Sequence, residues 1–139
     1  MQRWTPIWAG SLYFGLIFSV GFVFGTARTI ILAGLSGDHR MLAVLVEVPV
    51  ILTASWLACG FVVRRLGVAS TRSARLLMGT SAFALLMIAE TLLDVLLFKR
   101  SLAAHIAQYR EASQIVGLAA QMIFAAMPLW VARRPALAR

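Results

Sequence analysis

The chain has 139 residues, which is room for one domain. Hydrophobic residues make up 61% of it and charged residues only 13%, whereas an ordinary soluble domain has roughly 25% charged residues. A water-soluble globule cannot bury so much apolar surface, and a disordered chain has far less of it. The composition therefore excludes a soluble protein and predicts an integral membrane protein.

Four apolar stretches follow one another along the chain, each long enough for the roughly 20 residues that a bilayer core requires. Backbone polar groups in lipid must be paired within their own segment, so each stretch is expected to be a helix. The sequence thus predicts an all-α fold, an integral membrane four-helix bundle that forms a single transmembrane domain over residues 1–139. The expected spans are about 7–35, 41–63, 74–98 and 112–132.

The basic residues predict how the bundle is oriented. The net charge is +8, but the arginines flank apolar runs and form no single face, so we expect no nucleic-acid partner. Eight of the thirteen basic residues fall on one side of a four-span chain, which the positive-inside rule places in the cytoplasm with both termini. Size and helix number are typical of small bacterial inner-membrane proteins. The eight are Arg3, Arg64, Arg65, Arg72, Arg75, Arg133, Arg134 and Arg139.

Apart from Arg75, the second residue of the third span, four charged residues lie inside the predicted spans, namely Arg28, Glu47, Glu90 and Asp94. At about 1.5 Å per residue, Arg28, Glu47 and Glu90 lie roughly 10, 9 and 12 Å from the outer ends of their helices. Charges at such depth are costly and usually face protein or water. We expect an intramembrane charge cluster in which Arg28 bridges Glu47 and Glu90, with Asp94 as a water-exposed neighbour. Its role is either an ion-pair lock or a proton or ion site.

Small and polar residues share faces on the predicted helices. Gly21 and Gly25 form a G-x-x-x-G on the face that carries Arg28, and we expect them to let a second helix approach closely, within the bundle or in a partner. In the third span Gly79 and Glu90 share a face. One side of the fourth span carries Gln114, Gln121 and Ala125. These stripes are expected to point inward.

The connection Lys99–Ser113 leaves two structures open. Leu102, Ile106 and Tyr109 fall at helical spacing, which fits a short interfacial helix with one apolar face. Alternatively, the third helix simply continues into the headgroup layer.

Metal and cofactor chemistry find little support. His39 and His105 fall outside the spans, and neither has a companion at metal-ligand spacing. No C-x-x-C-H occurs for haem attachment. We therefore expect neither a metal site nor a cofactor.

Three classes of function remain. The one we favour is a structural or accessory subunit that packs in a homo-oligomer or a larger membrane complex, with lipids and membrane subunits as its partners. The alternative is a small proton- or ion-coupled transporter or channel, which works as an oligomer through its intramembrane carboxylates. The third is a lipid-modifying membrane enzyme, in which the carboxylates are the only candidate acid and base. Enzyme function is the least expected of these.

Overall fold

The computed structural model describes residues 5–34 and 39–131, and these residues form helices and connecting turns without a strand. Four stretches are long and apolar enough to cross a membrane. Where the predicted span boundaries fall on described residues, they differ from the helix ends by at most two positions; the boundaries at 35 and 132 lie outside the described residues. The elements are α1 (Thr5–Ala33), α2 (Arg40–Arg65), α3 (Arg72–Leu92) with its π-helical continuation η1 (Leu93–Leu97), α4 (Leu102–Gln108) and α5 (Ala112–Val131).

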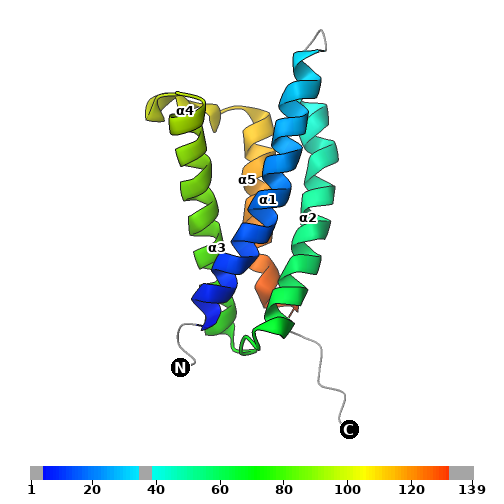
Figure 1. The fold of residues 1–139 in the computed structure, drawn as a ribbon, viewed down its shortest axis with the longest axis vertical. Coiled ribbons are helices and arrows are strands. Elements are labelled where there is room, and N and C mark those ends of the chain that lie inside the picture. Colours follow the sequence, from blue (N-terminus) through cyan, green and yellow to red (C-terminus); the bar gives the residue numbers. More distant parts are fainter. Residues whose placement is uncertain (1–4, 35–38, 132–139) are drawn as a thin grey trace.

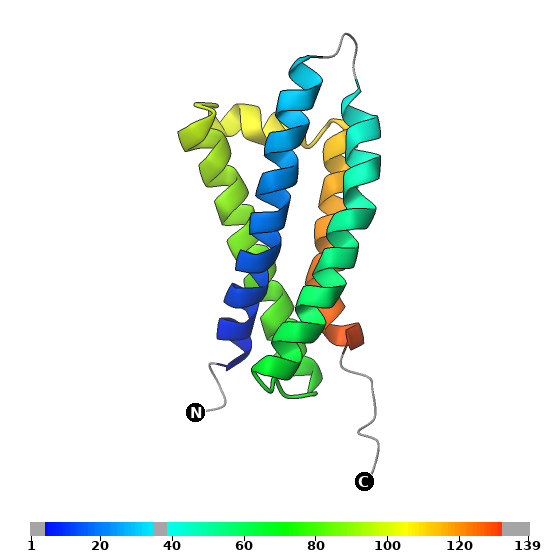
Figure 2. The same ribbon diagram turned by 45° about the vertical axis from the view of Figure 1, so that its right-hand side comes forward.

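The four long helices form a bundle in which α1 and α5 each pack against both α2 and α3 (Figure 1). The start of α1, the α2–α3 loop and the end of α5 lie at one end, as four long helices that alternate in direction require (Figure 2). We call this the loop end. Of the basic residues expected on this side, Arg3, Arg133, Arg134 and Arg139 lie outside the described residues.

The apolar core occupies the half of the bundle nearest the loop end. Tyr13 of α1 reaches across the bundle to α5, where its ring stacks on Phe124 with centroids 4.3 Å apart. Its hydroxyl donates to the Phe124 carbonyl oxygen at 3.2 Å, which satisfies the one polar group of this buried ring. Other buried members of the core are Ala9, Ile17, Cys59, Val62, Met78, Ala82 and Met127.

Two glycines allow the helices to approach closely, and they differ from the pair that the sequence suggested. A Cβ on Gly79 would collide with the carbonyl oxygen of Ala125, so α3 and α5 meet backbone to backbone here. A Cβ on Gly10 would likewise collide with Ser81 and with the Met78 carbonyl oxygen. The expected inward stripes of the third and fourth spans therefore do meet, through Gly79 and Ala125.

Gly21 and Gly25 make no such approach. No atom lies within 4 Å of the position that a Cβ would take at either residue. The prediction that they bring another helix of this bundle close is wrong, because the closest helix contacts lie toward the loop end, at Gly10 and Gly79. Contact with a partner through these glycines stays a prediction.

The α2–α3 loop is held by a buried arginine. Gly67 takes a left-handed φ of +59° in the turn, a conformation that favours glycine. Thr71 caps α3 by accepting the Ala74 N–H. Arg75, only 4% exposed, donates from Nε to the Ala69 carbonyl and from Nη2 to the Val68 carbonyl, both at 3.0 Å. This arginine is therefore a structural part of the loop as well as one of its positive charges.

Candidate functional site

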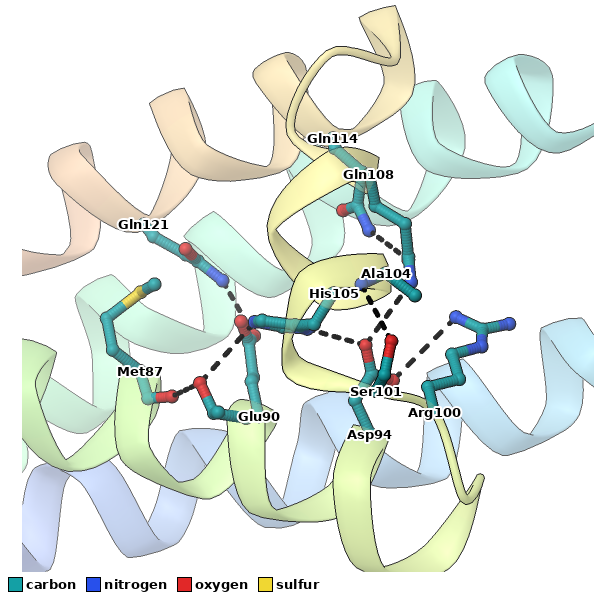
Figure 3. Close-up of polar contacts among 11 residues, drawn as sticks. Met87, Glu90, Asp94, Arg100, Ser101, Ala104, His105, Gln108, Gln114 and Gln121 are labelled. Atoms are coloured by element: carbon teal, nitrogen blue, oxygen red, sulfur yellow. Dashed lines mark hydrogen bonds and ion pairs between the residues drawn. The ribbon is translucent and has the colours of Figure 1, made fainter.

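Polar side chains gather where α3, α4 and α5 meet, at the end of the bundle opposite the loop end (Figure 3). We call them the α3–α4–α5 polar network. Its members are Glu90, Thr91, Asp94, Arg100, His105, Gln108, Gln114 and Gln121.

Local backbone geometry brings this network together. After Leu92 the helix widens into the π turn η1, and such turns often occur at functional positions. Lys99 then adopts a left-handed φ of +52°, which ends the helix and reverses the chain. Ser101 caps α4 by accepting the Ala104 N–H at 3.2 Å. As a result α4 crosses the end of the bundle (Figure 2), and the alternative in which the third helix simply continues is wrong.

The face that α4 turns inward is polar. His105 is its buried residue, whereas Leu102 and Ile106 of the expected apolar face are exposed. Ser101, His105 and Gln108 fall at i, i+4 and i+7, so a polar stripe for this short helix was already visible in the sequence. His105 does lie outside the long helices, as the sequence predicts, but its contacts with Asp94 and Thr91 are not predicted by the sequence.

Asp94 is the centre of the network. Its Oδ2 accepts the Nδ1–H of His105 at 2.6 Å and lies 3.5 Å from the Gln108 amide nitrogen. Its Oδ1 lies 3.8 Å from the Arg100 guanidinium. The expectation of a water-exposed Asp94 is wrong, since α4 folds over the carboxylate and leaves it 17% exposed.

The order Asp94, His105, Thr91 resembles the acid–base–hydroxyl order of a hydrolase triad, but the hydroxyl is differently engaged. His105 Nε2 lies 3.4 Å from Thr91 Oγ1. The Thr91 hydroxyl donates its only proton to the Met87 carbonyl oxygen at 2.8 Å. Because that proton points to the helix backbone, His105 is not positioned to remove it. The arrangement ties α4 to α3.

Glu90 lies one turn before Asp94 and reaches toward α5. Its Oε1 accepts a hydrogen bond from the Gln121 amide nitrogen at 2.6 Å. The Gln121 amide oxygen is buried and has no donor within hydrogen-bond distance. Directly after α4, Tyr109 packs edge-on against His105, and burial together with the negative charges of Glu90 and Asp94 raises the pKa of its phenol.

Arg28 and Glu47 form a separate contact between α1 and α2. The guanidinium Nη1 lies 2.5 Å from Glu47 Oε2, with the arginine side chain 34% and the glutamate 12% exposed. The expected contact of Arg28 with at least one glutamate is thus present. The expected bridge to Glu90 is not: Glu90 bonds to Gln121 of α5.

The four charged residues therefore belong to two groups rather than one cluster. The reason is that η1 and α4 fold back over α3 and supply Asp94 with partners, while α5 supplies the partner of Glu90. The sequence predicts that Arg28, Glu47 and Glu90 lie at similar distances from the outer ends of their helices. Such distances do not say which helices are neighbours in the bundle.

Metal binding finds no geometric support among residues 5–34 and 39–131, where no three His, Cys, Asp or Glu side chains come close enough to hold an ion. The site is a set of hydrogen bonds and ion pairs between helices. No protein-family model matches this chain, and comparison with curated proteins and with solved structures finds no match either.

Proposed function

We propose that this protein is a structural or accessory subunit of a bacterial inner membrane, which packs with copies of itself or within a larger membrane complex. Both termini face the cytoplasm in this proposal. The four long apolar helices support the membrane location, and the arginines around the α2–α3 loop support the orientation.

One observation carries the proposal: Arg28, Glu90 and Asp94, which lie away from the loop end, each contact a polar group of a neighbouring element. Arg28 joins α1 to α2, Glu90 joins α3 to α5, and Asp94 joins η1 to α4. Polar contacts of this kind hold helices together in lipid, where the hydrophobic effect does not. A catalytic site needs a side-chain group that is available to a substrate. The Thr91 hydroxyl is not available, because it donates its proton to the Met87 carbonyl oxygen.

Large apolar side chains cover the outside of α1 and α2 away from the core, among them Phe22, Val23 and Ile30. Gly21 and Gly25 lie on the same helix with open space beside them. In lipid this surface suits contact with another transmembrane helix, because packing around small residues drives such association.

The test is to extract the chain from its native membrane in a mild detergent and measure the particle mass by light scattering. We expect a mass above that of one chain, from a homo-oligomer or from additional subunits. A Gly21→Leu/Gly25→Leu variant should shift the mass toward the monomer, whereas Gly15→Leu, which also has open space around it, is the control. A monomer in the unaltered protein would contradict the proposal.

A second function is favoured by Glu90, and it is proton or ion transfer. In the part of the chain that the structure describes, its carboxylate is in no ion pair and its hydrogen-bond partner is the Gln121 amide. That amide serves both protonation states: its nitrogen donates to the carboxylate, and after a 180° rotation its unused oxygen accepts from the carboxylic acid.

Proton flux into vesicles that contain the purified chain tests this second function. Flux that Glu90→Gln abolishes and Glu111→Gln retains would establish it; Glu111 is the matched control because it is an exposed carboxylate paired with Arg40. The absence of flux in the unaltered protein would remove the second function and leave the first.

A further inference from the structure

A shallow groove of about 400 Å³ runs between α2 and α5 on the outside of the bundle. Its lining side chains are apolar apart from the Thr53 hydroxyl and the indole N–H groups of two tryptophans. Two tryptophans line it, Trp56 from α2 and Trp130 near the end of α5, together with Leu57, Ile123 and Met127. A groove of this character has the shape and polarity for an acyl chain.

A second hollow of about 300 Å³ lies nearer the loop end, lined by Phe61, Arg64 and Arg65. Leu57, Phe61 and Arg64 fall at i, i+4 and i+7 on α2, so they share one face of the helix. Leu57 belongs to the groove and the other two to the hollow, so the hollow lies along the same face of α2, about one turn nearer the loop end.

The Arg64 head group lies at the α5 side of this hollow. A Cβ placed on Gly60 would meet Arg64 Nη1 at 3.4 Å and Val131 Cγ1 at 3.7 Å. The guanidinium therefore lies over Gly60, near Val131, which directly follows Trp130 on α5. The absence of a side chain at position 60 leaves room for this placement.

These two arginines lack a counter-charge. Arg64 and Arg65 are exposed, and among the described residues neither takes part in a salt bridge. The carboxylates among residues 5–34 and 39–131 lie elsewhere: Glu90, Asp94 and Glu111 belong to the opposite half of the bundle, and Glu47 is paired with Arg28. Two guanidiniums available to an external anion thus lie beyond the loop-end side of the groove, on the same helix.

We propose that this surface binds an anionic phospholipid, with the phosphate at Arg64 and Arg65 and one acyl chain along the groove beside Trp56 and Trp130. Guanidiniums pair with phosphate oxygens through two parallel hydrogen bonds, and basic pockets between membrane helices on the cytoplasmic side bind anionic head groups. The inference rests on the membrane location of the proposed function. The inference assigns a specific ligand to Arg64 and Arg65, whose only other proposed role is to orient the chain in the membrane.

Quenching of tryptophan fluorescence by lipids with brominated acyl chains measures this contact. The probe is a phosphatidylcholine vesicle that contains brominated phosphatidylglycerol or, at the same mole fraction, brominated phosphatidylcholine. The full chain carries Trp4→Phe and Trp8→Phe, so that the signal comes from Trp56 and Trp130. We expect stronger quenching by the anionic lipid, saturating at low mole fraction.

Variants that remove one arginine charge distinguish a specific lipid-binding site from general attraction of anionic lipids to the positive surface. Arg64→Gln should weaken the preference for the anionic lipid roughly fivefold, and the double variant with Arg65→Gln roughly 25-fold. Arg72→Gln is the matched control, since Arg72 is an exposed arginine at the same end of the bundle but outside the hollow. Equal effects of Arg64→Gln and Arg72→Gln would overturn the site.

The remaining measurements distinguish a lipid phosphate from free phosphate as the ligand, and they test the membrane location separately from the lipid site. Added inorganic phosphate should not relieve the quenching, and relief at concentrations comparable to the lipid would overturn a lipid ligand. Equal quenching by both brominated lipids overturns the site but leaves the membrane location intact. No quenching by either lipid contradicts membrane insertion and the site with it.

Discussion

Substituting alanine at Gly79 should destabilise the bundle, whereas the same change at Gly25 should not. The two glycines lie in long apolar helices and gain the same methyl group on substitution. They differ in surroundings: a Cβ at position 79 collides with the Ala125 carbonyl oxygen, and a Cβ at position 25 meets nothing within 4 Å. The pair therefore isolates the contact between α3 and α5 from any general effect of the substitution.

The magnitude follows from two opposing terms. Alanine is favoured over glycine inside a helix by about 1 kcal/mol, and this gain applies at both positions. At Gly79 the obstacle is backbone, which cannot rotate away as a side chain can, so the helices must separate, at a cost near the upper part of the usual 1–3 kcal/mol range for overpacking. We expect a net loss of about 1–2 kcal/mol for Gly79→Ala and a gain of up to about 1 kcal/mol for Gly25→Ala.

The assay is unfolding of the purified protein in mixed micelles, in which a denaturing detergent is titrated and helicity is followed by circular dichroism. Gly10→Ala, which meets Ser81 and the Met78 carbonyl, should behave like Gly79→Ala. Equal unfolding free energies for the Gly79 and Gly25 variants would refute the assignment of close packing to the loop-end half.

Three further predictions concern other parts of the molecule. Replacing His105 by alanine should release α4 and raise hydrogen exchange over residues 99–111 without unfolding the long helices, whereas the exposed Ile106→Ala should leave exchange unchanged. Arg75→Leu should lower the free energy of unfolding by about 1–3 kcal/mol, because the Val68 and Ala69 carbonyls lose their donors; thermal unfolding checks this, and Arg72→Leu should have little effect. Reporter fusions at Gly67 and after Arg139 should both be cytoplasmic; an external signal from either would reject the proposed orientation.

The helices and their approximate ends follow from the pattern of hydropathy along the chain, because a long apolar run with few charges has few structures open to it. The α4 helix was predictable only as one of two alternatives. The structure decides between them through the chain reversal at Lys99. This lysine has a left-handed backbone conformation, which no local sequence rule predicts for lysine.

The candidate site was only partly predictable. Sequence identified Glu90 and Asp94 by their charge, and the periodicity placed Gln121 on an inward face. It could not pair them, because pairing depends on which helices are neighbours in the bundle. His105 was missed because hydropathy puts it in a loop. Gly79 was expected to face inward, but neither Gly79 nor Gly10 has a second glycine four residues away that would have marked it as a close helix contact.

The central claim is that the charged side chains tie neighbouring helices together, and a double-mutant cycle on Arg28 and Glu47 tests it most directly. Since Arg28 is one-third exposed, we expect each single change to leucine to cost less than the 3–5 kcal/mol typical of a broken buried pair, about 1–3 kcal/mol. The double variant should cost less than the two single changes together, with a coupling energy above about 1 kcal/mol. Single effects that simply add would show that the ion pair does not hold α1 to α2 and would contradict the claim.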